Sequence, residues 1–466
     1  MRGKLRNFSL IVFGALFGLA VSLHFSAVAN KDAESPLPID ELRAFTEVFG
    51  KIKSDYVEPV ADKKLINEAI NGMLSGLDPH SAYLDQDAFK DLQVSTQGEF
   101  GGLGIEVGME DGFVKVVSPI EDTPAFVAGI KPGDLIIKLD ETPVKGLTLG
   151  DAVKRMRGKP NSKITLTLLR KGELKPIVVT LTRAVIQIKS VKSRLLDPNY
   201  PYIRITQFQE HTGEDLVKAI DALTKQNKAP MQGLVLDLRN DPGGLLNSAI
   251  AVSAAFLPKD TLVVYTEGRS EEAKMRLNAS KEYYVRGTQT DYLKNLPAWT
   301  KTVPMVVLVN GGSASASEIV AGALKDHKRA IIMGTQSFGK GSVQSILPLG
   351  NGTAIKLTTA RYYTPSGNSI QAKGITPDIM VEDATVNETE KQILSVREAD
   401  LERHLINDKD TQPDANPVKL PPPTKKAKDD KLGKPSAVDP ETAIKQDYQI
   451  NQALNLLKGL QIIQRR

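Results

Sequence analysis

The spacing of apolar residues divides this chain into parts of different texture. From 39 to 77, apolar residues recur every three or four positions, which is typical of amphipathic helices. From 97 to 184, short apolar runs are separated by glycines, which predicts a small block made mostly of β-strands. From 202 to 333, unbroken apolar runs alternate with helix-like stretches, and this alternation predicts a layered α/β domain.

The expected elements follow from these runs. In the β-rich block we expect strands at 114–117, 135–139, 164–169 and 177–181, with short helices at 124–130 and 149–156. In the α/β domain we expect strands at 203–205, 233–238, 304–309 and 330–333, with helices at 247–256 and 317–324.

The N-terminus has the pattern of an export signal. Basic residues come first, an apolar stretch from 8 to 23 follows, and Ala27-Val28-Ala29 matches the small-x-small site of signal peptidase. The apolar run is short for a membrane span, which needs about 20 residues. We therefore expect a signal peptide at 1–29, with an uncleaved membrane anchor as the alternative. Either alternative places the rest of the chain in the periplasm or another extracytoplasmic compartment.

The C-terminal part consists of two segments. Residues 407–440 are rich in Pro, Lys and Asp, and we expect a largely disordered linker at 386–440. Residues 441–466 have the spacing of an amphipathic helix, whose apolar stripe is Ile444, Tyr448, Ile450, Leu454, Leu457, Leu460 and Ile463. We expect this helix to dock on another subunit and so to build a homo-oligomer. The alternative is docking on the chain's own core.

Composition excludes several kinds of chemistry. The chain has 466 residues, which suggests two or three domains, and its 41% hydrophobic and 25% charged residues are close to the soluble average. The net charge of +5 gives no general case for nucleic-acid binding. Cysteine is absent, and the five histidines do not form an HExxH zinc motif. We therefore expect no metal and no cofactor.

Two glycine motifs resemble nucleotide-binding loops only superficially. The run from Gly334 to Gly341 contains the Gly-Lys of a P-loop, but Gly341 stands where the motif needs Ser or Thr. The run from Gly101 to Ile105 leads into strand-like sequence, so no helix N-terminus is present to bind a pyrophosphate. Its successive backbone N–H groups are suited instead to a peptide's terminal carboxylate, with a simple tight turn as the alternative.

Ser315 is the candidate nucleophile, because it follows a buried strand and opens a helix whose dipole favours negative charge. The alternative is capping, since Ser315 and Glu318 have capping-box spacing. His327 is a poor base, because at about 1.5 Å per residue it lies about 18 Å along the same helix. His211 remains an open alternative.

Lys340 can serve as the base if burial lowers its pKa. It lies between two glycines, and Gln344 falls on the same face of an extended segment. The alternative is an ordinary exposed lysine. Glycines in the turn from Asp237 to Gly244 are candidates to direct N–H groups at an oxyanion, with a plain strand-to-helix turn as the alternative.

The β-rich block resembles a PDZ domain. The resemblance spans about residues 97–184 and rests on the segments 100–105, 124–136 and 149–157. It implies that a peptide C-terminus is held by the loop residues Gly102, Leu103, Gly104 and Ile105. It also implies that Arg157 couples peptide binding to activity, and a solvated surface arginine is the alternative.

Three further motifs, at 237–244, 313–319 and 338–344, together resemble the carboxyl-terminal processing proteases over about residues 40–385. That resemblance implies a fold with an α/β crotonase-like protease core, an inserted or preceding β-rich PDZ domain and helical N- and C-terminal regions. It implies Ser315 as nucleophile, Lys340 as general base and Gln344 as its support. The implied oxyanion hole consists of the N–H of Ala316 and that of Gly243 or Gly244.

The resulting hypothesis is a serine endopeptidase that recognises the C-termini of extracytoplasmic proteins, needs no metal or nucleotide and binds no nucleic acid. An adaptor protein is a further candidate partner. The expected domains are a signal peptide (1–29), a helical region (36–96), a PDZ domain (97–184), a protease core (185–385), a linker (386–440) and a helix (441–466). The rivals are a PDZ scaffold with a dead second domain, which should have lost Ser315, Lys340 or Gln344, and a P-loop ATPase, which Gly341 disfavours.

Overall fold

The computed structural model describes residues 37–382, 397–409 and 447–464, apart from 121, 174, 188, 286, 288 and 289. The chain divides into two compact units, with the boundary between Ile70 and Asn71. The predicted signal peptide, 1–29, lies outside the described residues. Among the helices that the structure describes, none combines the length and the apolar character needed to cross a membrane.

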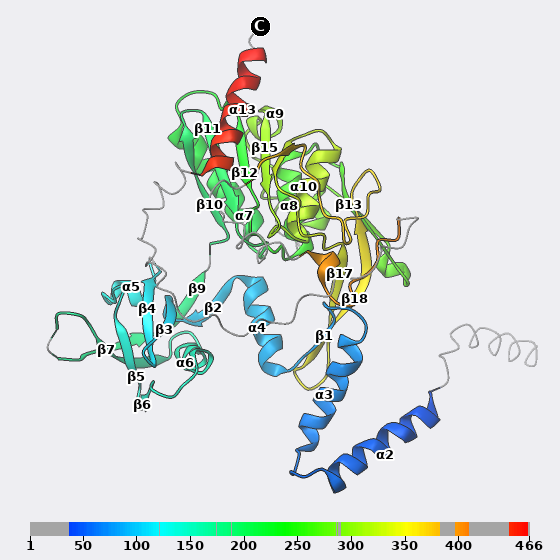
Figure 1. Ribbon diagram of the computed structural model, residues 1–466. Helices are drawn as coiled ribbons and strands as arrows, with labels where there is room; N and C mark the ends of the chain where they lie inside the picture. The colour runs from blue at the N-terminus through cyan, green and yellow to red at the C-terminus, as the bar shows by residue number, and fades with distance from the viewer. Residues whose placement is uncertain are drawn as a thin grey trace, which may run out of the picture. The chain divides into compact units, whose positions relative to one another are not determined.

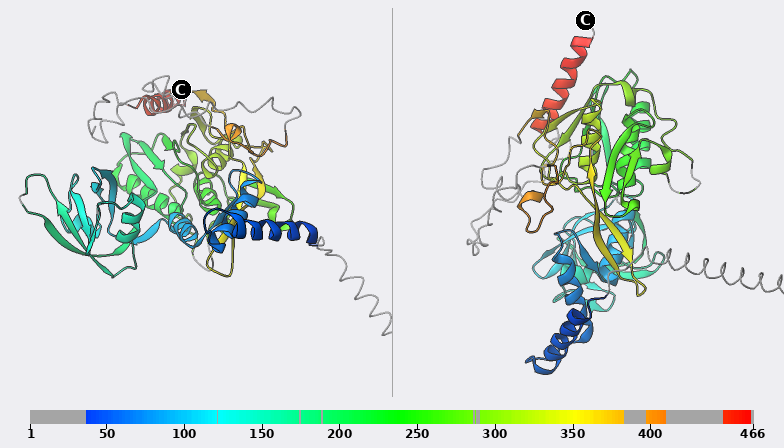
Figure 2. Two further views of the ribbon diagram at one scale, coloured as in Figure 1. Left: turned by 60° about the horizontal axis from the view of Figure 1, so that its bottom comes forward. Right: turned by 90° about the vertical axis from the view of Figure 1, so that its right-hand side faces the viewer.

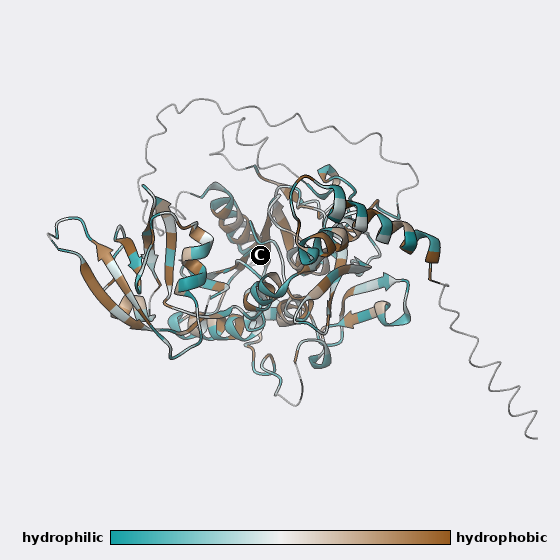
Figure 3. Ribbon diagram, turned by 90° about the horizontal axis from the view of Figure 1, so that it is seen from below, coloured by the Kyte–Doolittle hydropathy of each residue, from teal (hydrophilic) through white to brown (hydrophobic). Residues whose placement is uncertain are grey.

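The first unit contains helix α2 (Ile39–Asp55) and most of α3 (Asp62–Ser75). None of the residues of α2 is buried. Its apolar residues Leu42, Phe45, Val48 and Ile52 are between 37% and 58% exposed. Figure 3 shows hydrophobic and hydrophilic residues mixed along this helix. As described, α2 therefore has an apolar face without a partner.

The β-rich block forms a sheet of its own, with strand order β3-β4-β5-β7-β8 and a short strand β6 beside β5. Alternate residues of these strands, such as Val114, Ile136 and Leu166, are fully buried in one core. The four strands expected at 114–117, 135–139, 164–169 and 177–181 are confirmed. The elements are β3 (Ile105–Glu110), β4 (Phe113–Pro119), α5 (Pro124–Val127), β5 (Leu135–Leu139), β6 (Thr142–Pro143), α6 (Leu149–Met156), β7 (Lys163–Leu169) and β8 (Ile177–Thr182).

Helix α4 (Gln86–Gln97) and a two-stranded ribbon lead into and out of this block. Asp85 caps α4 by accepting a hydrogen bond from Ala88 N at 2.8 Å, and the helix ends at Gly98, whose φ of 74° suits glycine. In the ribbon, β2 (Glu99–Gly102) pairs antiparallel with β9 (Ala184–Gln187). The chain therefore enters and leaves the block through neighbouring strands.

The α/β core is built on a six-stranded sheet with order β10-β11-β12-β15-β16-β19. Every neighbouring pair of strands from β11 to β19 is parallel. Parallel strands whose two faces are both covered have unbroken apolar sequences. Every residue of β12 and β15 is accordingly buried. The strands are β10 (Val191–Asp197), β11 (Tyr200–Ile205), β12 (Leu234–Asp237), β15 (Met305–Val309), β16 (Ile331–Gly334) and β19 (Ile379–Met380).

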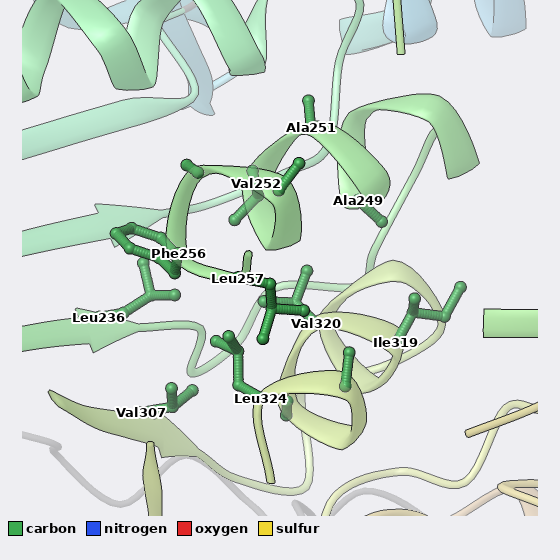
Figure 4. Packing of buried hydrophobic residues seen from close by; sticks show 14 of the residues in the cluster. Leu236, Ala249, Ala251, Val252, Phe256, Leu257, Val307, Ile319, Val320 and Leu324 are labelled. Atoms are coloured by element: carbon green, nitrogen blue, oxygen red, sulfur yellow. The ribbon is translucent and has the colours of Figure 1, made fainter. Parts of the chain in front are cut away.

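Helices cover one face of this sheet. Leu236 and Val307 point to that face and pack against helix residues such as Phe256 and Val320, as Figure 4 shows. The helices are α7 (Thr212–Gln226), α8 (Leu246–Phe256), α9 (Trp299–Thr302) and α10 (Ala316–Asp326). Successive side chains of a strand point to opposite faces of the sheet. The intervening residues Val235, Val306 and Leu308 therefore point to the opposite face.

A second sheet carries the lysine turn expected at 339–341. Its strand order is β1-β18-β13-β14, and β17 also pairs with β18. The segment after Gly341 is a strand, as predicted. Figure 2 shows β17 and β18 as long yellow strands. The elements are β1 (Ala82–Leu84), β13 (Leu262–Gly268), η1 (Glu271–Ala273), β14 (Met275–Asn278), η2 (Lys281–Tyr283), β17 (Ser342–Pro348) and β18 (Ala354–Tyr363).

The C-terminal helix α13 (Tyr448–Gln464) docks on the chain's own core, so the expectation of docking on another subunit is wrong (Figure 1). Ile450, Ala453 and Leu457 are buried against the free face of the six-stranded sheet. Two residues of the predicted apolar stripe do not take part in this packing, since Tyr448 and Ile463 are 47% and 71% exposed. The sheet supplies a large apolar surface that the other helices leave open, and this explains the docking. Ile444 lies outside the described residues.

Part of the expected linker is folded. Within 386–440, residues 397–409 pack on the core and include the 3-10 helix η3 (Glu398–Asp400). Glu398 is fully buried, and its carboxylate binds His80 Nε2 at 2.8 and 2.9 Å. The polar composition of this segment did not predict the contact between Glu398 and His80. A buried carboxylate needs hydrogen-bond partners, and here the partner lies far away in the sequence.

Candidate active site

Ser315 occupies the N-cap position of α10, as the sequence suggested. Its φ of 55° and ψ of −111° are unusual for a residue with a side chain. Such strain persists only where the surroundings enforce it, and it is common at active sites. Here Asp241 O accepts hydrogen bonds from Ala314 N at 3.0 Å and from Ser317 Oγ at 2.9 Å, so the residues on either side of Ser315 are held.

Lys340 lies on the turn between β16 and β17, and the backbone of this turn is fully engaged. Gly339 and Lys340 donate their N–H groups to Glu318, and the Tyr362 hydroxyl donates to Lys340 O. Gly341 N donates to Gln371 Oε1 at 3.0 Å. A Cβ on Gly341 would lie 2.4 Å from a backbone atom of Gln371, so this position requires glycine.

Glu318 joins the serine segment to the lysine segment. It is fully buried, and its Oε2 accepts from Ser315 N at 2.8 Å and from Lys340 N at 2.9 Å. Its Oε1 accepts from Ser337 Oγ at 2.5 Å and from Gly339 N at 2.7 Å. The capping interaction expected from the sequence is present, but the same carboxylate also holds the lysine turn. One oxygen atom therefore links the backbones of Ser315 and Lys340.

The surroundings of Lys340 favour its neutral form. Burial lowers the pKa of its amine, and the neighbouring charge of Lys356 lowers it further, while Glu398, Glu318 and Asp78 act in the opposite direction. The net pKa lies below the ordinary lysine value. The alternative of an ordinary exposed lysine therefore does not describe this side chain. Within the described residues, no hydrogen bond joins its Nζ to Ser315 or Gln344.

The pKa of Glu318 is raised to about 7 because burial disfavours its charge, although the four donors around it oppose this effect. Both of its oxygens already accept two hydrogen bonds each. A proton on either oxygen would displace one of the donors. The arrangement is therefore complete only when the carboxylate is ionised.

Tyr362 is a further residue that the sequence did not reveal. Its side chain is 2% exposed, and its hydroxyl contacts Lys340 O and lies beside the Ser315 side chain. Burial raises the pKa of this phenol well above its ordinary value, so the hydroxyl keeps its proton. Nothing local marks the residue, because it comes from the end of β18 and meets the site only through the sheet.

Gln344 lies on β17, shortly after the turn that carries Lys340. A β-bulge between Val343 and Gln344 breaks the regular alternation of β17. The Gln344 amide donates to Ser342 Oγ at 2.9 Å and to Thr358 Oγ1 at 3.2 Å. Thr358 in turn donates to Asp78, one of the carboxylates that acts on Lys340.

The glycine pair lies against the segment that contains Ser315. A Cβ on Gly243 would lie 2.8 Å from Ser315 Cβ and 2.8 Å from Ala316 N, so only glycine permits this approach. Its own N–H is occupied, because it donates to Asp241 Oδ1 at 2.8 Å. The N–H groups of Gly244 and Ala316 have no acceptor among the described residues.

The alternative bases are occupied elsewhere. His327 lies at the far end of α10 and its Nε2 is 2.7 Å from Leu262 O. His211 directs its ring nitrogens to Glu99 and Glu214, at 3.6 and 3.5 Å. Across the part of the chain that the structure describes, no group of three or more potential metal ligands occurs.

The glycine loop of the β-rich block precedes an edge strand, since among the described strands β3 pairs only with β4. Gly104 has a φ of 77°, and a Cβ there would lie 2.2 Å from Thr123 Cβ. Its carbonyl accepts from Ile120 N, whereas the N–H groups of Leu103 and Gly104 find no acceptor within the described residues. The loop and the free edge of β3 are therefore available to an extended peptide.

Arg157 follows α6 and contacts α4. Its Nη1 is 3.0 Å from Asp91 Oδ1, and its guanidinium lies 5.1 Å from the centre of the Phe100 ring. The side chain is 41% exposed. It therefore bridges the peptide-binding block and the helix that leads into the block.

Comparison with known proteins identifies the family. The sequence model of "Peptidase family S41" matches residues 199–381, that of "PDZ domain" matches 101–181, and that of "Activating protease CtpB N-terminal domain" matches 20–88. A carboxy-terminal-processing protease of Bartonella bacilliformis is 45% identical over 97% of this chain and 96% of its own length. The chain belongs to the carboxy-terminal processing proteases of family S41. It is a serine protease with a PDZ domain.

A second curated relative agrees with this assignment. The protease CtpB of Bacillus subtilis is 38% identical and covers 76% of this chain and 70% of its own length. Among solved structures, the photosystem II D1 C-terminal processing protease is 30% identical, with a TM-score of 0.40, covering 72% of this chain and 86% of its own. The family expected from the three motifs is confirmed.

The activity of the protease should rise with pH through about 7. Below that pH the Glu318 carboxylate binds a proton, one of its four donors loses its acceptor, and the turn that carries Lys340 loosens. The sequence also predicts Lys340 as the general base, and on that prediction activity should rise further as Lys340 loses its proton, at a pH below the ordinary lysine value. The measurement is kcat/KM for a peptide substrate against pH. A profile that falls between about pH 6 and pH 8 would contradict this reading.

Proposed function

We propose that this protease is an endopeptidase in which Ser315 is the nucleophile and Lys340 is the general base. The observation that carries the proposal is the binding of both backbones by the single carboxylate of Glu318. The lowered pKa of Lys340 supports it, because a base must be neutral to accept a proton. The core that holds this pair is proposed to be crotonase-like.

In this mechanism the Lys340 amine takes the proton from Ser315 Oγ as the oxygen attacks the scissile carbonyl carbon. The carbonyl oxygen gains negative charge and accepts hydrogen bonds from the N–H groups of Ala316 and Gly244. We favour Gly244 over Gly243 because the N–H of Gly243 is already bound to Asp241. The Lys340 ammonium then protonates the leaving amine, and a water molecule hydrolyses the acyl-enzyme.

Gln344 supports this base indirectly. Its amide fixes Thr358 Oγ1, which also donates to Asp78, and the charge of Asp78 acts on Lys340. Gln344 therefore sets the position of a carboxylate near the amine. Its role is orientation, and it transfers no proton.

The PDZ domain is proposed to recognise the C-terminal tails of extracytoplasmic substrate proteins. A terminal carboxylate would bind at the loop from Gly102 to Ile105, where N–H groups lack an acceptor in the described structure. The peptide backbone would then pair with the free edge of β3. Export through a signal peptide cleaved after Ala29 would bring the protease to these substrates in the periplasm, and an adaptor protein is a further proposed partner.

Three substitutions test the Ser/Lys pair. Ser315→Ala removes the nucleophile and Lys340→Ala removes the base, and each should lower kcat by about 10²- to 10⁴-fold or more. Lys340→Arg should be equally inactive, because a guanidinium stays protonated. Cleavage of an unfolded protein is measured by mass spectrometry, and circular dichroism checks the fold. An active, folded Lys340→Arg protease would contradict the assignment of Lys340.

Arg157 is proposed to couple tail binding to activity through its contacts with Asp91 and Phe100. Arg157→Ala should lower kcat for a tailed protein substrate several-fold, while the isolated tail peptide binds as before. The matched control is Lys154→Ala, which removes the exposed ion pair of Lys154 with Asp87 on the same two helices. Equal activity of Arg157→Ala and the unaltered protease on long substrates would contradict a regulatory role.

The protease is also proposed to form a homo-oligomer through the apolar face of α2, with a second copy of α2 as the occupant. The support is that no residue of this helix is buried, although large apolar residues such as Leu42, Phe45 and Val48 recur along it. The double variant Phe45→Ser, Val48→Asp should reduce the mass measured by light scattering to that of one chain. Glu47→Lys, at an exposed polar position between them, serves as control. An unchanged mass for the double variant would rule out this interface.

A further inference from the structure

Arg239 links the C-terminal helix to the strand end that leads to the active-site glycines. Its side chain is nearly buried, and all of its N–H groups are used. Nε and Nη2 donate to Asp237 at 2.9 and 2.7 Å. Nη1 and Nη2 donate to Asp447 at 3.1 and 2.8 Å, and Nη1 also donates to Gln449 at 2.7 Å.

The residues that meet Arg239 form the start of α13. Asp447 Oδ1 accepts from Ile450 N at 3.0 Å, so the same carboxylate caps the helix and binds the arginine. Gln449 donates its amide to Val381 O at 2.6 Å and is fixed from both sides. The start of α13 is therefore attached to Arg239 by three hydrogen bonds, two to the Asp447 carboxylate and one to the Gln449 amide oxygen.

The residues that follow Arg239 reach the nucleophile segment directly. Asn240 has a φ of 56° and exchanges two hydrogen bonds of 2.9 Å with the side chain of Asn310, where the loop to Ser315 begins. Asp241 binds the residues on both sides of Ser315 through its carbonyl, and its side chain binds Gly243 N. The conformation of 239–243 therefore sets the position of the glycines relative to Ser315.

The electrostatic balance at Arg239 depends on the helix. Burial acts to raise the pKa of Asp237, but the hydrogen bonds and charge of Arg239 lower it below its ordinary value. Without α13, Arg239 would lose three of its five hydrogen bonds and would have to find new partners. A buried guanidinium that is only partly satisfied is costly, so the strand end would rearrange.

We propose that Asp447 and Gln449 are positioning residues for catalysis, which act through Arg239 to hold the turn 240–244 against Ser315. The C-terminal helix is then part of the catalytic apparatus as well as a cover for the sheet. The inference rests on the proposed function, because it assumes that Ser315 is the nucleophile and that the turn supplies an oxyanion donor.

The test uses full-length chains with Asp447→Asn, Asp447→Glu or Gln449→Leu. Asn keeps the helix cap but removes the charge. The readouts are the rate at which a fluorophosphonate probe labels Ser315, and kcat and KM for a peptide with a fixed C-terminal tail. Asp447→Asn and Gln449→Leu should slow labelling and lower kcat by about 10- to 100-fold, as expected when catalytic groups are misplaced. KM should change little, because the tail binds to the PDZ domain, and Asp447→Glu should retain more activity than Asp447→Asn.

The matched control is Lys458→Met. Lys458 lies on the same helix and pairs with Asp197 at the surface, with no contact to Arg239. Its labelling rate should stay within about twofold of the unaltered protease, because exposed ion pairs contribute little. Thermal unfolding of every variant gives the folded fraction at the assay temperature.

Two results would overturn the proposal: folded Asp447→Asn and Gln449→Leu chains that label at the unaltered rate, or losses that only follow the unfolded fraction. Equal losses in Asp447→Glu and Asp447→Asn would also overturn it. Failure of the proposed function is distinguishable, since the unaltered protease would then show no labelling at Ser315 and no difference from Ser315→Ala.

Discussion

The active site depends on one buried carboxylate. Glu318 binds the backbone N–H of the proposed nucleophile and that of the proposed base with the same oxygen atom. Ser315 opens a helix of the six-stranded layer, whereas Lys340 belongs to a turn that enters the second sheet. The carboxylate of Glu318 therefore joins two parts of the fold. This link holds the backbones of the two residues close to each other, because both donate to Glu318 Oε2 within 2.9 Å.

Burial disfavours the charged form of both Glu318 and Lys340. Removing a charge from water costs several kcal/mol, and each hydrogen bond to a charged group returns about 1.5–3 kcal/mol. Glu318 has four such donors and can remain ionised, while Lys340 Nζ has no hydrogen-bond acceptor among Ser315, Gln344 and the other described residues. The four donors limit the rise of the Glu318 pKa, which reaches about 7, whereas no hydrogen bond opposes the lowering of the Lys340 pKa.

Sequence patterns identified the elements and the reactive residues better than they identified their partners. Unbroken apolar runs predicted β12 and β15. The serine and lysine motifs predicted the proposed pair of residues and the family. Glu318 was visible only as a cap of Ser315, because its second contact lies on a turn that periodicity does not relate to α10. Tyr362 and Arg239 were missed as site residues for the same reason. Such contacts depend on strand order and register, which a local pattern does not contain.

The C-terminal helix shows how this limit affects a functional conclusion. Its apolar stripe indicated that it docks, but a stripe does not say on which surface. The deciding contacts are polar: Asp447 and Gln449 complete the hydrogen bonds of an arginine that already faces a buried aspartate. Apolar packing by Ile450, Ala453 and Leu457 supplies attraction to the sheet, whereas the charged contacts select one position along it. Because that position lies at the strand end leading to Gly243 and Gly244, the docking of the last helix and the geometry of the active site are set by the same guanidinium.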